Sequence, residues 1–298
     1  MVKYIGSKEA AAKWGLTDRQ VRILCGKGYV IGAIQTNKWV WCIPDDAPRP
    51  VDGRMARRYE QRNIRLGSID ITLLNALRAG NGLGDKLFTN QAFQGQLASL
   101  FSLGSALDKN HISQKEALSA LSGEPRRISF LDAVKVLDFR AAILGQCGKG
   151  TGYDIVSLLS LHRIFCQGWN DRGGGMVRED GVEEGRLSCE AELVAFFRNY
   201  DSKWSSVHPI FKACLLMGQL AKLNPFPSDN GLFCILAVSA WLVGEGFLPP
   251  YLEADDMAEI SADLALALGK GNYQDLARTF ERTMKDAYRK VFQVAGNV

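Results

Sequence analysis

Apolar residues recur every three or four positions through most of the chain after residue 68, and this spacing is typical of amphipathic α-helices. Ser113 and Glu116 stand three positions apart at the start of one such stretch, as in a capping box. Few segments show the alternation of apolar and polar residues that marks a strand. The spacing therefore predicts helices over 69–79, 93–101, 113–121, 130–144, 155–165 and 191–200, and another that starts at the HPIF sequence of residues 208–211.

The first 53 residues carry a different pattern. Two short helical stretches lie on either side of a turn at Gly15, and Thr17 with Gln20 forms a capping box for the second stretch. After Gly28, two short β-segments are expected around residues 35–38. A helix, a turn, a second helix and a β wing form a DNA-binding layout, in which the second helix enters the major groove. The segment resembles the small winged helix-turn-helix domains of the excisionase and MerR type.

Positive charge is concentrated in the same N-terminal part. Residues 1–65 contain 13 Lys and Arg against 6 Asp and Glu, a net charge of +7, whereas the rest of the chain contains 23 against 26. This asymmetry favours double-stranded DNA as the partner of the small domain, with protein docking as the alternative. Arg19 and Arg22 are the leading candidates for base contacts, and the whole candidate set is Arg19, Gln20, Arg22, Lys27 and Lys38, of which the two lysines would meet phosphates.

A proline-bearing, arginine-rich run between residues 44 and 65 is typical of a linker. The expected organisation is a winged helix-turn-helix domain over 1–53, a basic linker over 54–68 and a helical domain over 69–298. The linker arginines either extend the phosphate contacts or form an ordinary solvated surface.

The sequence LNPFPSDNGLFCI at residues 223–235 contains the most informative turn. One apolar helix ends there and another begins, so backbone N–H groups at the start of the second helix carry partial positive charge. Such a turn can bind an anion, although the same residue types are common in ordinary turns between helices. The candidate anion- or nucleotide-binding loop consists of Pro227, Ser228, Asp229, Asn230 and Gly231.

This turn resembles the active-site sequence HPFxDGNGRxxR of the Fic family, with NPF at residues 224–226 and NG at residues 230–231. The stretches LHRIF, GGMVR, HPIFKA and GEGFLPP follow the Fic order. The resemblance spans about residues 69–292. It implies a mainly α protein with an all-α Fic-like domain and a short β-hairpin flap at residues 173–187, which would hold a protein partner by strand addition. It also implies transfer of AMP, or another phosphate-bearing group, from a nucleotide to a protein hydroxyl.

The residues that carry Fic chemistry differ in this chain. The resemblance places the general base at Asn224, the acidic Mg²⁺ ligand at Ser228 and two phosphate-binding arginines at Leu232 and Ile235. An amide cannot accept a proton near neutral pH, and an apolar side chain cannot bind phosphate. Asp229 stands where the family has glycine; it either replaces the metal ligand one residue late or repels phosphate.

A second stretch, from Ser105 to Asn110, is similar to the Fic inhibitory motif SxxxE(G/N). Asp108 occupies the glutamate position, and the position four residues before it is Gly104. The resemblance pairs that glutamate with the second motif arginine, which is Ile235 here. We therefore expect Asp108 to be a loop or helix-cap residue without the regulatory partner.

Together these observations favour a DNA-binding regulator whose Fic-like domain has lost transfer chemistry and binds a ligand or a partner, with no cofactor and no metal site. The alternative is a protein adenylyltransferase that uses ATP and Mg²⁺ through a rebuilt site, in which Asp229 acts with His111, His162 or His208. A scaffold that binds neither DNA nor nucleotide is a third possibility, which a buried second helix would indicate.

The compartment is expected to be the cytoplasm. The N-terminus lacks the pattern of a secretory signal, and the longest apolar run, residues 233–243, is too short to span a bilayer. The seven cysteines form no CxxC pair and no Cys/His cluster, so we expect reduced thiols and no zinc site.

Overall fold

The computed structural model describes most of the chain. Three predicted features lie wholly or partly outside the described residues: the candidate contacts Lys27 and Lys38, residues 54–63 of the linker and residues 180–187 of the flap. The chain divides into two compact units, and the described residues of the first lie within 3–49 and those of the second within 64–179 and 188–292. The described residues are 3–26, 30, 33–37, 40–45, 47, 49, 64–83, 87, 90–147, 154–170, 173–179 and 188–292.

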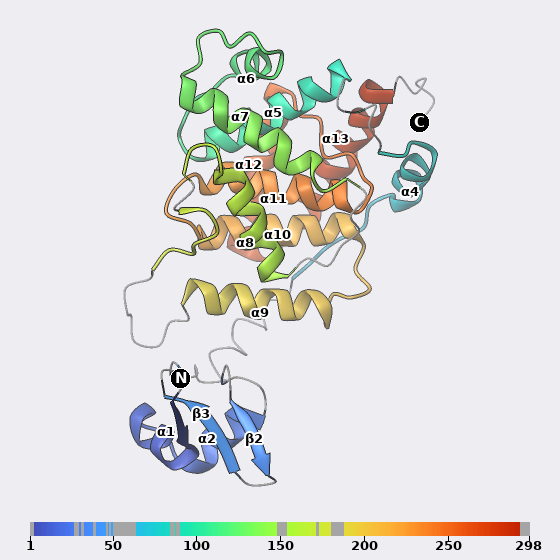
Figure 1. Ribbon diagram of the computed structural model, residues 1–298. Helices are drawn as coiled ribbons and strands as arrows, with labels where there is room; N and C mark the ends of the chain where they lie inside the picture. Colours follow the sequence, from blue (N-terminus) through green and yellow to red (C-terminus); the bar gives the residue numbers. More distant parts are fainter. Residues whose placement is uncertain are drawn as a thin grey trace. The chain divides into compact units, whose positions relative to one another are not determined.

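The described residues of the N-terminal unit form two helices and a three-stranded antiparallel sheet of strand order β1-β3-β2 (Figure 1). The turn between the helices follows the predicted signals, because Gly15 has a left-handed φ of 64° and Thr17 N–H donates to Gln20 Oε1 at 2.8 Å. Ala10, Trp14 and Val21 pack in a small separate core. The elements are β1 (Tyr4–Gly6), α1 (Ser7–Trp14), α2 (Asp18–Gly26), β2 (Ile34–Asn37) and β3 (Val40–Pro44).

The described residues of the larger unit form helices joined by loops and turns, with one isolated bridge between Arg65 and Asn272. The protein is therefore mainly α, as the apolar spacing predicts. No described helix combines the length and the apolar character that a membrane span requires. The helices are α4 (Ile71–Gly80), α5 (Gln91–Leu107), α6 (Gln114–Leu121), α7 (Phe130–Leu144), α8 (Ile155–Cys166), α9 (Cys189–Asp201), α10 (Pro209–Leu223), α11 (Asn230–Gly244), α12 (Ala254–Lys270) and α13 (Gln274–Phe292).

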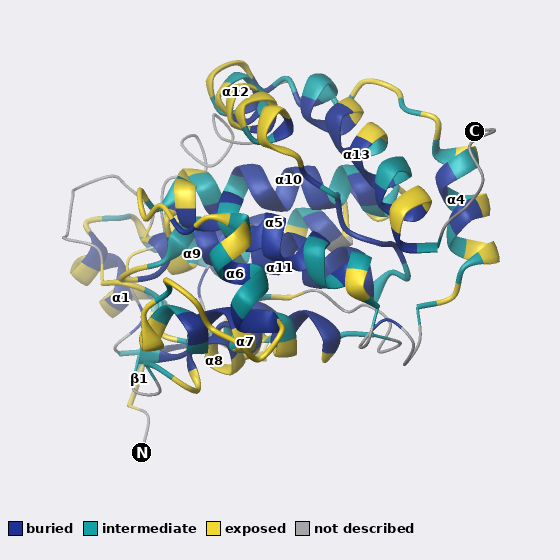
Figure 2. Ribbon diagram, turned by 90° about the horizontal axis from the view of Figure 1, so that it is seen from above, coloured by how far each residue is buried: buried dark blue, intermediate teal, exposed yellow. Residues whose placement is uncertain are grey.

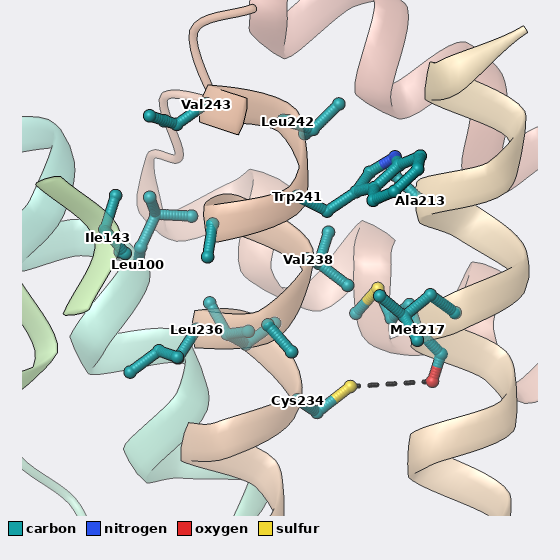
Figure 3. Close-up of a cluster of buried hydrophobic side chains, with 14 of the residues drawn as sticks. Leu100, Ile143, Ala213, Met217, Cys234, Leu236, Val238, Trp241, Leu242 and Val243 are labelled. Atoms are coloured by element: carbon teal, nitrogen blue, oxygen red, sulfur yellow. Dashed lines mark hydrogen bonds between the residues drawn. The ribbon is translucent and has the colours of Figure 1, made fainter. Parts of the chain in front are cut away.

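Helix α11 forms the centre of this unit. Every residue from Leu232 to Val243 is buried, as expected for a helix that is apolar on all sides. Helices α5, α7, α8 and α10 pack against it, and Figure 2 shows how little of α11 is exposed. In the close-up of Figure 3, Trp241 lies beside Ala213 of α10, and its indole N–H donates to Pro209 O at 3.1 Å. The Fic-like turn thus lies at the N-terminal end of the most deeply packed helix of the unit.

Helix α5 is longer than predicted. The apolar spacing predicts its end at Phe101, but the helix continues to Leu107 through the small buried residues Gly104 and Ser105. Small residues add little to an apolar pattern, yet they allow the close helix packing described below. The extension places Asp108, the C-cap residue of α5, beside the start of α11.

Candidate functional site

The Fic-like turn between α10 and α11 is fixed by the side chain of Asn230. Its Oδ1 accepts from Phe226 N–H at 2.8 Å, and its Nδ2 donates to Phe226 O at 2.7 Å. Asn224 and Asp229 have left-handed φ values of 45° and 54°, a conformation that asparagine and aspartate tolerate better than most residues. Helix α11 then begins at Asn230, so the predicted start of a second helix within residues 223–235 is confirmed.

Phe226 anchors the turn in the core. Only 1% of its surface is exposed. Its ring stacks on the His162 ring with 3.6 Å between centroids and meets the Phe233 ring edge-on at 4.7 Å. Phe226 is thus held by ring contacts that involve none of the motif positions that carry Fic chemistry.

The N-terminus of α11 is occupied by a carboxylate of the same chain. Gly231 N–H donates to Asp108 Oδ1 at 2.7 Å, and Leu232 N–H donates to Asp108 Oδ2 at 2.8 Å. These are two of the N–H groups that a helix leaves without an internal partner, and they are the groups that would bind an anion. Asp108 therefore caps α11 from the end of α5, across 123 residues of sequence.

Two glycines allow this contact. A Cβ atom on Gly231 would lie 2.5 Å from Leu107 Cβ, and a Cβ atom on Gly104 would lie 2.8 Å from Leu232 Cα. Atoms do not approach this closely without a shift of the backbone, so the present contact of α5 with α11 requires glycine at both positions. The resemblance to the inhibitory motif marked Gly104 and Asp108, but it did not reveal what the carboxylate binds.

Opposing effects act on the pKa of the Asp108 carboxyl. Burial raises its pKa from the ordinary aspartate value, and the nearby Asp229 charge acts in the same direction. The two backbone N–H donors from Leu232 and Gly231 and the Lys135 charge lower the pKa in part. The net direction of the pKa shift is upward, so the half-buried carboxylate stays in this position at a desolvation cost.

Asp229 is engaged by a buried lysine that sequence reasoning missed. Lys135 Nζ lies 2.5 Å from Asp229 Oδ1, and Ser228 Oγ donates to Asp229 Oδ2 at 2.7 Å. Lys135 is 9% exposed, and its ammonium group lies 4.3 Å from the centroid of the Trp169 ring. Asp229 makes no side-chain cap on α11 because its carboxylate is paired with Lys135. Within the described residues, no group of three or more His, Cys, Asp or Glu residues could hold a metal ion.

The positions that the resemblance assigns to phosphate-binding arginines belong to the core. Leu232 is 3% exposed and Ile235 is 4% exposed. Asn224, at the position of the general base, is exposed at the end of α10. Of the candidate loop, Pro227 and Ser228 are exposed, whereas Asp229, Asn230 and Gly231 are half-buried.

His162 is a buried histidine whose two ring nitrogens both have neighbours to bind. Its Nδ1 accepts from Gly175 N–H at 2.9 Å, and its Nε2 faces Cys166 Sγ at 3.5 Å. Burial lowers the pKa of His162 to about 4, so the ring is neutral near neutral pH. His208 caps α10 through Ile210 N–H at 3.4 Å, whereas His111 is exposed.

The described start of the predicted flap lies against the Fic-like turn. Arg178 N–H donates to Pro225 O and Arg178 Nε donates to Asn224 O, both at 2.8 Å, while Arg178 Nη2 donates to Leu223 O at 3.2 Å. Together with the Gly175 bond to His162, these contacts fix the segment beside the end of α10. Residues 173–179 contain no strand, and the remainder of the flap lies outside the described residues.

The candidate DNA contacts on α2 differ in their surroundings. Arg19 is exposed. Gln20 is exposed as well, but its Oε1 accepts from Thr17 N–H as the predicted capping box requires. Arg22 is half-buried and forms an ion pair with Asp18 one turn earlier in the same helix. Arg19 is therefore the candidate base contact on α2 that the fold uses least.

Sequence comparison detects no matching protein family and no matching curated protein. Comparison of structures does find similar proteins. Fic-1 from C. elegans aligns with a TM-score of 0.61 and 18% identity over 75% of this chain and 70% of that chain. A Fic family protein from Desulfovibrio desulfuricans aligns with a TM-score of 0.54 and 14% identity over 78% of each chain. A Fic-domain-containing signaling protein from Bacteroides thetaiotaomicron aligns with a TM-score of 0.53 and 13% identity over 76% of this chain and 99% of that chain. The chain thus has a Fic-like fold.

Proposed function

We propose that the protein is a DNA-binding regulator whose Fic-like domain does not transfer nucleotides and instead binds a ligand or a protein partner. The N-terminal unit would contact double-stranded DNA through α2. The helical unit would supply the regulatory body, with the segment at residues 173–187 as the surface for a protein partner.

The loss of transfer chemistry is supported chiefly by the carboxylate at the start of α11. A nucleotide phosphate would have to displace Asp108 from the N–H groups of Gly231 and Leu232, against the repulsion between two anions. The displaced site would offer no arginine, because the corresponding positions are the buried residues Leu232 and Ile235. Electrostatic stabilisation of the transferred phosphate is the main contribution of a protein to such chemistry, and little of it remains here.

DNA binding is supported by the exposed outer side of α2 and by the charge of the N-terminal part. Arg19 is exposed on this helix, whereas Val21 and Cys25 on its opposite side belong to the small core. The net charge of +7 over residues 1–65 favours a polyanion. Because Arg22 would have to leave Asp18 to reach a base, we expect Arg19 to make the stronger base contact.

The test is a fluorescence anisotropy titration of the full chain with pooled random-sequence duplexes, followed by the selected sequence. The wild-type protein should bind with an affinity that falls steeply as salt rises. Arg19→Ala should weaken specific binding by about 5- to 150-fold, the range of one arginine–guanine contact. The matched control is Arg126→Ala, since Arg126 is an exposed arginine of the helical unit. This variant should bind the selected duplex with the same affinity as wild type. Absence of binding to every duplex at low salt would refute the proposal.

A further inference from the structure

Helix α2 presents a line of three exposed residues to solvent. Arg19, Ile23 and Gly26 follow one another at spacings of four and three, which places them on one face. All three are exposed, and Ile23 keeps 47% of its surface exposed. A Cβ atom added at Gly26 would meet nothing within 4 Å.

Ile23 is an apolar side chain outside the N-terminal core. The core contains Val21 and Cys25 from the same helix, and Leu24 packs against it, but Ile23 is not among the described residues that form this core or pack against it. The exposed 47% of its surface is therefore not used in packing among the described residues of this unit. Beside the cationic Arg19, it gives the outer face of α2 one charged donor and one apolar group.

This pairing matches the chemistry of base edges in the major groove. A guanine presents two acceptors that suit an arginine, and a thymine presents a C5-methyl group, which suits an apolar side chain. We infer that Ile23 is a specificity-determining residue that contacts a thymine methyl group, an inference that rests on the proposed function. Gly26, with no side chain, leaves room for the end of the helix to approach the DNA.

The geometry also limits where the thymine lies. Four residues of helix advance by about 6 Å, at about 1.5 Å per residue. Successive base pairs advance by about 3.4 Å. If Arg19 contacts a guanine, the thymine contacted by Ile23 should therefore lie within about two base pairs of it.

The experiment uses the full chain and a duplex selected from a random pool. Each thymine of the bound site is replaced in turn by uracil, which pairs identically but lacks the C5-methyl group. Wild-type protein should lose about fourfold in affinity at one thymine, which corresponds to about 0.8 kcal/mol for one buried methyl group at 25 °C. Ile23→Ala should bind the thymine and uracil duplexes equally at that position.

Leu137→Ala is the matched control, because Leu137 is a similarly exposed apolar residue on α7 of the helical unit; this variant should keep the preference for thymine. The inference is overturned if wild-type protein binds the thymine and uracil duplexes equally at every position of the site. It is also overturned if Ile23→Ala keeps the preference for thymine. In both cases DNA binding, and with it the proposed function, would stand. Absence of binding to any duplex at low salt would overturn both.

Discussion

Replacing Asp108 with alanine should destabilise the helical unit by about 2 kcal/mol. Hydrogen bonds to a charged acceptor contribute about 1.5–3 kcal/mol each, and loss of a helix N-cap costs about 0.5–2 kcal/mol. The burial of the carboxylate and its repulsion from Asp229, which raise the pKa of Asp108, offset part of this gain. In the variant, the N–H groups of Gly231 and Leu232 would lose their acceptor.

The assay combines urea denaturation, followed by far-UV circular dichroism, with hydrogen exchange of the Gly231 and Leu232 amides. Both amides should exchange faster in Asp108→Ala. Asp108→Asn should fall between the two proteins, since it keeps one carbonyl acceptor but no charge. Asp286→Ala serves as the control, because Asp286 makes a partly exposed pair with Arg289 on α13; it should change stability by about 0.5 kcal/mol at most. Unchanged stability and unchanged amide exchange in Asp108→Ala would refute the reasoning.

Two further perturbations test the packing around the Fic-like turn. Gly231→Ala should destabilise the protein by about 1–3 kcal/mol, because its Cβ atom would overlap Leu107, whereas Gly269→Ala in α12, where nothing lies within 4 Å, should leave stability unchanged or raise it by up to about 1 kcal/mol. Equal changes in the free energy of unfolding for the two variants in urea denaturation would contradict the close contact of Gly231 with Leu107. Burial lowers the pKa of His162 from 6.5 to about 4, so the unfolded chain binds a proton that the folded chain does not, and stability should fall by up to about 3 kcal/mol as pH drops from 6.5 to 4. His162→Gln should reduce this slope, and an unchanged slope in denaturation curves at several pH values would show that His162 is not its source.

The parts of the fold that sequence predicts are those set by near neighbours. Ser113 and Glu116 form the capping box that their spacing of three predicts, with Glu116 Oε2 accepting from Ser113 N–H at 2.8 Å. Gly15 ends α1 as expected. Strand β1 was not predicted, because three residues are too few to show an alternating pattern, and its place depends on pairing with β3.

The contacts that define the candidate site are long-range, and the sequence marks only their ends. Asp108 and Gly231 are 123 residues apart, and Lys135 and Asp229 are 94 residues apart. Nothing in the local pattern around Lys135 distinguishes it from a surface lysine. The resemblance placed Phe226 correctly because an aromatic anchor is a packing requirement of the turn, independent of chemistry.

The central claim, that the Fic-like domain transfers no nucleotide, is tested most directly by incubating the full chain with α-³²P-labelled ATP and Mg²⁺. An intact Fic-type transferase serves as the positive control, and lysate proteins supply possible targets. We predict no label on the protein itself or on lysate proteins, either for wild type or for Asn224→His, because restoring a base leaves Asp108 at the phosphate position and leaves Leu232 and Ile235 in the core. Strong labelling by the unmodified protein would contradict the account and would favour the alternative of a rebuilt transferase site.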